Sequence, residues 1–233
     1  MLDLRSISRA LCFFAHPDDE TLGAGATMHR LGRLGSEVHV AIPATGIHAR
    51  RNVESETLRE ERMGTLREDC SAALAMLAID PTRIHLGEFA DNELDRYTRL
   101  ELIHWLEALI DTVRPDVILT HHRYCTNIDH QYCHEAAIVA TRPSVSSHVS
   151  LLAGEVPSST GYLRPARWEP NLYVEISEED LEGKISAMEA YKGEARPDPH
   201  PRSPEVLRAL AKVRGSESGY SLAEAFMVQR AFG

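Results

Sequence analysis

The sequence lacks the features that define several protein classes. It has 4 cysteines in 233 residues (Cys12, Cys70, Cys125 and Cys133), and no two of them form a CxxC pair. This excludes a disulfide framework and a zinc knuckle, and we expect all four thiols to be reduced. The opening stretch MLDLRSISRALCFFAH contains Asp3 and two arginines, and its apolar run is only five residues long. It predicts neither a signal peptide nor a membrane span, so we expect a cytoplasmic protein.

An excess of positive charge is also missing. The chain has 25 Lys and Arg against 35 Asp and Glu, a formal net charge of −10. Nucleic acids and anionic membrane surfaces attract clustered Lys and Arg, so neither is an expected partner. The first strand-to-helix turn has no GxGxxG motif and supplies acids where a pyrophosphate would sit, which argues against a dinucleotide cofactor.

What remains is the composition of an ordinary globular enzyme, with 43% hydrophobic and 26% charged residues. Apolar runs of about five residues alternate with longer amphipathic stretches, as in repeated βαβ units. We predict one α/β domain over residues 1–233, a Rossmann-like three-layer sandwich with a mostly parallel sheet. The expected strands are 10–15, 37–43, 83–86, 116–120 and 172–176, and the expected helices between them are 21–34, 55–78, 98–113 and 129–140.

The C-terminal third is predicted to be helical and rich in loops. A long irregular segment, 141–170, contains clusters of Ser, Gly and Pro. Three helix starts follow it: Ser177 with Asp180, Ser203 before Pro204 with Gly215 at the far end, and Ser221 with Glu224.

Polar side chains follow two of the expected strands. His16, Asp18 and Asp19 come after strand 10–15, and a His-rich stretch that includes His130 comes after strand 116–120. The carboxyl ends of parallel strands lie on one rim, where ligands bind. His16, Asp19 and His130 would supply two nitrogens and one oxygen, the ligand set of a catalytic zinc site with an open position. Asp18 could then face that position as a general base.

Other interpretations stay open. An acid at a helix start commonly caps the helix, and its negative charge interacts favourably with the helix macrodipole. His130 and His134 are four residues apart and could instead form a two-histidine zinc pair, although HQYCH lacks the Glu of zinc peptidases. Cys125 and Cys133 are expected to be small buried residues.

The remaining histidines differ in what they suggest. Of His121 and His122, one could face the site and the other the core. The stretch PDPHPRSPE, 197–205, places His200 and Arg202 in a proline-stiffened loop that either closes over a pocket or is a rigid connector. Six histidines have no convergent acidic partner in the sequence and are expected to be structural or surface residues: His29, His39, His48, His85, His104 and His148.

The motif AHPDDE, followed by TLGAG and later by NIDH at a helix start, resembles the LmbE/PIG-L family of zinc-dependent N-deacetylases. Four further matches extend the resemblance over nearly the whole chain: LREDCSAALAMLAI, FADNELD, RPDVILTHH and PHPRSPEVLRALAKVRGSESG. The resemblance implies a hydrolase that removes an acyl group, usually acetyl, from a 2-amino sugar such as an N-acetylglucosamine derivative, with zinc-bound water as the nucleophile. His16, Asp19 and His130 match the family's zinc ligands, and Asp18 matches its general base. Iron, cobalt or manganese would also suit these donors.

The chain departs from the family at Asn127, where many members have a histidine that helps to stabilise the oxyanion. An amide can donate a hydrogen bond but carries no proton to the leaving amine, so His200, then His122, or Asp18 itself would do so. Asp129 is expected to orient a neighbouring side chain. The candidate substrate contacts are Arg67, His122 and Arg202, with an exposed helical arginine paired to an acid as the plainer interpretation of Arg67.

Two rival functions are compatible with these residues. The same centre could hydrolyse another amide, an ester or a phosphoester, or the chain could be a non-catalytic binding protein that retains the fold. The intact set of His16, Asp18, Asp19 and His130 weighs against a binding protein. The sequence leaves open the rest of the substrate and whether the protein is a homo-oligomer.

Overall fold

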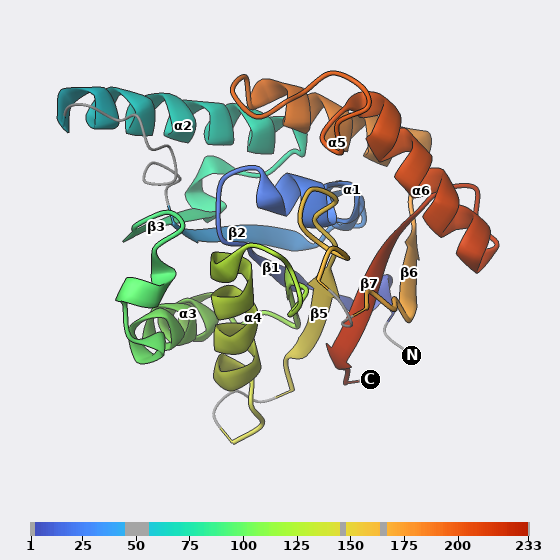
Figure 1. The fold of residues 1–233 in the computed structure, drawn as a ribbon. Helices are drawn as coiled ribbons and strands as arrows, with labels where there is room; N and C mark the ends of the chain where they lie inside the picture. Colours follow the sequence, from blue (N-terminus) through green and yellow to red (C-terminus); the bar gives the residue numbers. More distant parts are fainter. Residues whose placement is uncertain (1–2, 45–55, 145–147, 164–166, 233) are drawn as a thin grey trace.

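A seven-stranded sheet forms the centre of the molecule, with the strand order β3-β2-β1-β4-β5-β7-β6 (Figure 1). The computed structural model describes residues 3–44, 56–144, 148–163 and 167–232. The strands are β1 (Arg9–Phe13), β2 (Glu37–Ala44), β3 (Ile84–Phe89), β4 (Val117–His121), β5 (Ser150–Gly154), β6 (Leu172–Glu175) and β7 (Ala223–Arg230). The helices are α1 (Asp19–Arg33), α2 (Glu56–Met76), α3 (Arg99–Val113), α4 (Ile128–Ala140), α5 (Glu178–Ala190) and α6 (Pro204–Ser218), with short 3-10 turns at Leu4–Ser6, Pro81–Arg83 and Leu94–Arg96.

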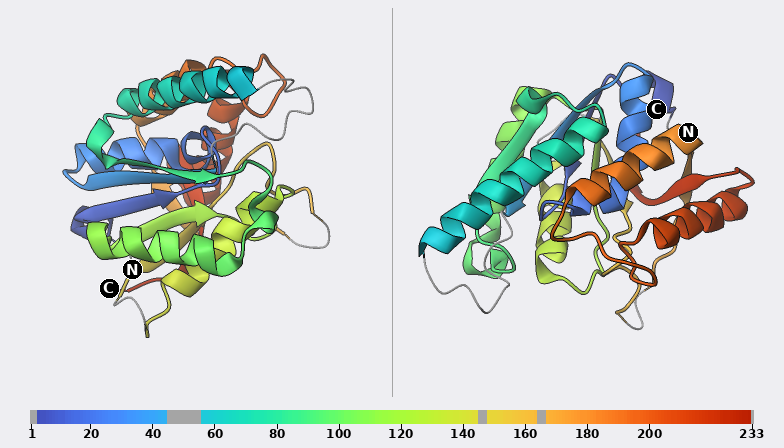
Figure 2. Two further views of the ribbon diagram at one scale, coloured as in Figure 1. Left: turned by 90° about the vertical axis from the view of Figure 1, so that its left-hand side faces the viewer. Right: turned by 90° about the horizontal axis from the view of Figure 1, so that it is seen from above.

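Helices cover both faces of the sheet. The views in Figures 1 and 2 place α3 and α4 on one face and α1, α2, α5 and α6 on the other. Each face has its own apolar core, one around Phe14, Leu22 and Met28, the other around Phe13, Leu106 and Ile118. The result is the three-layer α/β sandwich that the sequence predicts.

The strand order reverses direction at β1. The chain runs outward from β1 through β2 to β3, and then returns to place β4 on the other side of β1, with β1, β2, β3, β4 and β5 all parallel. In open α/β sheets such a switch point leaves a crevice outside the carboxyl ends of the two strands. The turn after β1 and the turn after β4 are therefore the expected place for a ligand.

Each predicted strand and helix before residue 141 is present, with ends shifted by no more than three residues. The prediction was wrong in two places beyond it. The segment 141–170 contains the fully buried strand β5, and the expected helix after Ser221 is the strand β7, which runs antiparallel between β5 and β6. Glu224 fits a capping box in the sequence but lies inside the protein, because the alternating chain AEAFMVQR completes the sheet.

Gly154 allows the closest approach between the sheet and α1. A Cβ atom at this position would lie 2.6 Å from the backbone oxygen of Gly23, which cannot move aside as a side chain can. We expect Gly154→Ala to lower the free energy of unfolding by about 1–3 kcal/mol through overpacking. Urea unfolding at 25 °C measures this loss. Gly64→Ala is the control, because nothing lies within 4 Å of a Cβ there and alanine favours the helix. Equal stability of the two variants would contradict the close approach.

Within the described ranges, no helix combines the length and the apolar character that a membrane crossing requires. The four cysteines are all buried, and none is joined to another in the part of the chain that the structure describes. The burial of Cys125 and Cys133 agrees with their expected role as small core residues.

Candidate metal centre

The residues of the AHPDDE motif form the turn between β1 and α1. Asp19 is the first residue of α1, and Asp18 before it has φ +105°, a conformation that side chains rarely adopt. The helix then packs tightly against the strand it follows, since a Cβ at Gly23 would lie 2.4 Å from the ring of Phe14. This local geometry leaves the side chains of His16, Asp18 and Asp19 at the carboxyl end of β1.

One oxygen of Asp19 lies between two imidazoles. Asp19 Oδ2 is 3.0 Å from His16 Nδ1 and 3.0 Å from His130 Nε2, and His130 comes from the first turn of α4. Asp19 and His130 are buried and the side chain of His16 is only 12% exposed, so each lone pair needs a proton or a cation between it and its neighbour. These separations are close to those between ligand atoms that share one tetrahedral metal ion. The three residues therefore fit a divalent cation as a set.

The second nitrogen of His16 fixes how the ring can act. His16 Nε2 lies 2.8 Å from Asp91 Oδ1 and 3.0 Å from Asp129 Oδ2. Two carboxylates hold a proton on Nε2, so Nδ1 is the nitrogen that would bind a cation beside Asp19, the arrangement that commonly orients a metal-binding histidine. Burial alone would lower the pKa of His16, but the acids Asp129, Asp19 and Asp91 together raise it well above its usual range. The trio of His16, Asp91 and Asp129 is thus a hydrogen-bonded support behind the candidate metal ligands.

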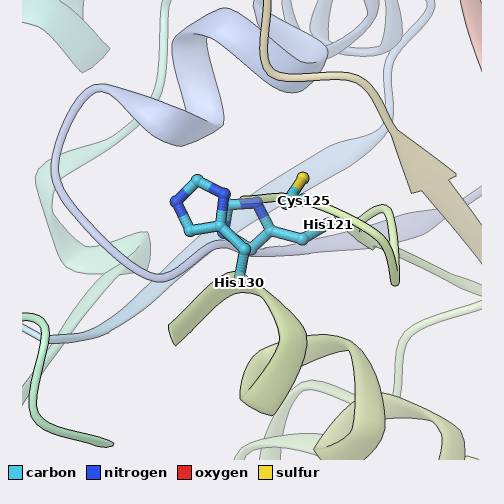
Figure 3. A group of neighbouring side chains, drawn as sticks. All are labelled: His121, Cys125 and His130. Atoms are coloured by element: carbon cyan, nitrogen blue, oxygen red, sulfur yellow. The ribbon is translucent and has the colours of Figure 1, made fainter. Parts of the chain in front are cut away.

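A second group of potential ligands, His121, Cys125 and His130, shares His130 with the first (Figure 3). The rings of His121 and His130 are stacked, with centroids 3.8 Å apart and planes 18° from parallel, so their lone pairs do not converge on one point. His121 Nε2 also accepts a hydrogen bond from the backbone N–H of Ala15 at 2.7 Å, which leaves its proton on Nδ1. Burial keeps the pKa of His121 well below its usual range. We conclude that this group does not fit a metal, and that neutral His121 joins the end of β4 to the end of β1.

Asp18 has a different environment from Asp19. Although Asp18 occupies the N-cap position of α1, its side chain makes no capping hydrogen bond to the described backbone, so the capping interpretation is wrong for this residue. Its Oδ2 instead lies 2.8 Å from Nη1 of Arg202, which also bonds Glu194. Burial and the neighbouring Asp19 carboxylate raise the pKa of Asp18 well above its usual range, and Arg202 opposes that rise. The pKa of Asp19, by contrast, is held well below its usual range by His130 and His16 against the effect of burial.

A cavity of about 980 Å³ opens onto these side chains. Its walls come from the turns after β1 and β4, from α2, and from the chain after α5. His200 and Arg202, from the proline-rich loop 197–205, lie in its wall. The predicted residues that line the cavity are His16, Asp18, Asp19, Asn127, His130, His200 and Arg202.

Asn127 and Asp129 have structural partners as well as a place at the centre. Asn127 caps α4, because its Oδ1 accepts the backbone N–H of Asp129 at 2.8 Å, and its Nδ2 donates to Asn92. Asp129 is fully buried, with Oδ2 on His16 and Oδ1 accepting the N–H of Leu94. Asp129 therefore lies where a residue that orients His16 should lie.

Three predicted residues lie away from the cavity. Arg67 is exposed and lines a separate hollow on the other side of α2, with Pro81 and Leu86. His122 is buried against the rings of Trp168 and Tyr124, and burial lowers its pKa to about 4. His134 donates from Nδ1 to the backbone oxygen of His121 at 2.8 Å, so the two-histidine pair does not form. Local packing sets the direction of each of these side chains, since neighbouring positions on a strand or helix face different sides of that element.

The other histidines follow the sequence prediction with one correction. His29 does have an acidic partner, because its Nδ1 lies 2.8 Å from Asp180 Oδ1, but this contact joins α1 to α5 and not to the site. His39 and His85 stack on each other across β2 and β3. His48 lies outside the described residues.

The sequence missed several residues of the centre. Asp91 stands within the FADNELD match, and a buried acid next to His16 could have been proposed from that motif. Glu194, Tyr191 and Ser159 line the cavity without any local signal, since they come from loops and a helix end far along the chain. Ser159 Oγ is 3.3 Å from Nδ1 of His130, the side of that ring away from Asp19.

Known proteins resemble this chain in sequence and in fold. The sequence profile of the PIG-L family, described as GlcNAc-PI de-N-acetylase, matches residues 11–141. This range contains His16, Asp18, Asp19 and His130. The chain belongs to the PIG-L family. A diacetylchitobiose deacetylase of Thermococcus kodakarensis is 27% identical over 228 residues, which cover 94% of this chain and 82% of that protein.

Two solved structures show how widely this PIG-L fold is used. The N,N'-diacetylchitobiose deacetylase of Pyrococcus horikoshii has a TM-score of 0.77 at 21% identity, covering 97% of this chain and 85% of that one. A 4-carboxy-2-hydroxymuconate hydratase from Pseudomonas putida has a TM-score of 0.74 at 17% identity, covering 97% and 98%. At these identities the likeness concerns the fold alone. Because a hydratase shares it, the fold does not determine the activity of this PIG-L protein, which depends on its own site.

Proposed function

We propose that this PIG-L protein hydrolyses the N-acetyl amide of a 2-acetamido sugar derivative, giving acetate and a free amine. The observation that carries the proposal is the carboxylate oxygen of Asp19 held 3.0 Å from two imidazole nitrogens, beside the Asp18 carboxylate and open to one cavity. Membership of the family supports it. So does the likeness to an enzyme named for diacetylchitobiose, an acetylated amino sugar.

A divalent metal is part of the proposal. His16, Asp19 and His130 would hold the ion through Nδ1, Oδ2 and Nε2, and we propose zinc because three such ligands with an open position suit it. When bound, the metal would supply Lewis-acid polarisation of the acetyl carbonyl and a lower pKa for water. The two carboxylates behind His16 would make its Nδ1 a stronger donor.

Asp18 is assigned the proton transfers. Its carboxylate takes a proton from the attacking water as the new C–O bond forms, and returns that proton to nitrogen as the C–N bond breaks, so acetate and amine leave in balance. Arg202 holds one carboxylate oxygen and so limits the directions in which Asp18 can point. The other candidate acid, His200, has its pKa lowered by desolvation and by Arg202 and Arg196, which favours the neutral ring at pH 7. Asp18 is therefore the better donor to the leaving amine.

Asn127 is assigned the role of stabilising the oxyanion by a hydrogen bond. Its Nδ2 has two hydrogens, and Asn92 accepts one of them. The second is assigned to the oxygen of the acetyl group, because Asn127 also lines the cavity. The neutral amide of Asn127 can donate a hydrogen bond but cannot give a proton to the leaving amine as a protonated histidine could. This agrees with a mechanism in which Asp18 carries out both proton transfers.

The test is acetate release with and without metal. We expect the protein, prepared with zinc, to contain about one metal ion per chain and to release acetate from at least one of N-acetylglucosamine, N,N'-diacetylchitobiose and an N-acetylglucosaminyl inositol. Removal of the metal by a chelator should abolish the activity, and added zinc should restore it.

Other outcomes separate the rival functions. Phosphate release from sugar phosphates without acetate release would show a phosphoesterase. A protein that purifies without stoichiometric metal and releases no acetate would be a binding protein with the same fold. Either result would overturn the proposal.

A further inference from the structure

Glu20, the last residue of the AHPDDE motif, has no role in the proposed chemistry, yet it is fully buried beside Asp18. Its Oε2 accepts the backbone N–H of Asp18 at 3.0 Å. Its Oε1 accepts the hydroxyl of Thr21 at 2.7 Å and the hydroxyl of Tyr191 at 2.8 Å. A buried carboxylate is costly unless it is well bonded, and here both oxygens are used for contacts within the protein.

Tyr191 connects this carboxylate to the far wall of the cavity. Its side chain is 1% exposed and it ends α5, where the chain turns into the segment 192–202 that lines the cavity. At the end of that segment Arg202 bonds the carboxylate of Asp18 at 2.8 Å. Asp18 is therefore held twice by the same part of the chain: its backbone through Glu20 and Tyr191, and its side chain through Arg202.

The conformation of Asp18 explains why such support is needed. Its φ of +105° is unfavourable for a residue with a side chain, and conformations of this kind persist only where the surroundings enforce them. The N–H of Asp18 lies at the centre of the strained turn, and Glu20 is the acceptor that holds it. Without that bond, the backbone could relax and swing the carboxylate away from the ligands of the metal.

We propose that Glu20 and Tyr191 are positioning residues, which keep Asp18 in its strained conformation and so aim its carboxylate at the reacting water. This inference rests on the proposed role of Asp18 as the base. It predicts a defined kinetic signature, since a misplaced base slows the chemical step but leaves the binding of the substrate and the metal intact.

The first test is Tyr191→Phe, which removes one hydroxyl and keeps the ring in the core. We expect kcat to fall about ten- to a hundred-fold, with KM and the zinc content within twofold of the wild type. Tyr220→Phe removes a hydroxyl from an exposed tyrosine after α6 and should change nothing. A raised KM with an unchanged kcat would show that Tyr191 contacts the substrate instead, and would overturn the inference.

A double-mutant cycle shows whether the effect passes through Asp18. In an Asp18→Asn background, Tyr191→Phe should no longer lower kcat, because there is no base left to misplace. A purely structural role would cost the same factor in both backgrounds and would count against the inference. If Asp18→Asn keeps the wild-type kcat, the proposed base itself is wrong, whatever Tyr191→Phe does.

A second measurement does not depend on turnover. Amide hydrogen exchange at Asp18 reports on its bond to Glu20, and we expect exchange at least about ten-fold faster in Tyr191→Phe than in the wild type or Tyr220→Phe. Unchanged exchange together with an unchanged kcat would overturn the inference while leaving the proposed hydrolase intact.

Discussion

Replacing Asp18 by asparagine is expected to lower the rate of acetate release about 10²- to 10⁴-fold, the usual contribution of a general base. Asparagine has nearly the shape of aspartate, but its amide cannot take a proton from water. The metal should stay bound, because Asp18 is not one of the three proposed ligands, which meet at Asp19 Oδ2. Steady-state kinetics and metal analysis of the same preparation check both parts.

The control for this variant is Asp95→Asn, which changes an exposed acid in the 3-10 turn Leu94–Arg96. It should keep wild-type kinetics. Loss of metal in Asp18→Asn would assign Asp18 to the ligands, and a wild-type rate would remove it from the mechanism.

The largest effect on stability is expected from Lys184→Met. Lys184 is buried between α5 and α1, where its Nζ donates to Glu224 at 2.6 Å and to the backbone oxygen of Leu22 at 2.8 Å. Glu224 also accepts the N–H groups of Ala26 and Thr27. Removing the ammonium leaves a buried carboxylate without its counter-charge, so we expect the free energy of unfolding to fall by about 3–5 kcal/mol.

Urea unfolding at 25 °C measures this change, with Lys212→Met on the exposed side of α6 as the control. The control should lie within about 0.5 kcal/mol of the wild type. A loss below about 1 kcal/mol for Lys184→Met would show that the hydrogen bonds from α1 are sufficient for Glu224. Adding Glu224→Gln to Lys184→Met removes the unpaired buried charge. We expect this double variant to recover only part of the lost free energy of unfolding, since the amide has one acceptor oxygen for the two N–H groups of α1.

The sequence predicted the parts of the fold that depend on local pattern. The strands and helices before residue 141 have clear apolar periodicity, and the AHPDDE and NIDH motifs lie next to each other in space because β1 and β4 are neighbours. Polar residues at the ends of parallel strands meet on one rim, and this rule, together with the usual ligand set of a catalytic zinc site, predicted that His16, Asp19 and His130 come together.

The sequence predictions that failed concern residues whose positions depend on tertiary contacts. Glu224 has the spacing of a capping residue, and only the partner Lys184, forty residues earlier, shows that it belongs to a strand in the interior. Arg67 and His122 stand in matching motifs, but the rotation of α2 and the close packing of Trp168 turn them from the cavity. Tyr191 has no signal in its own neighbourhood, since its importance comes from Glu20, which is far away in the sequence.

The switch point of the sheet ties the centre to the integrity of the whole fold. His16 and Asp19 belong to the first crossover of the chain, whereas His130 belongs to the crossover that starts on the opposite flank of β1. A metal ion bound by all three residues would link the strands on one side of β1 to those on the other side. Separating the two halves of the sheet would then break the metal site. Because such an ion binds only the folded chain, its occupancy and the folding equilibrium rise and fall together.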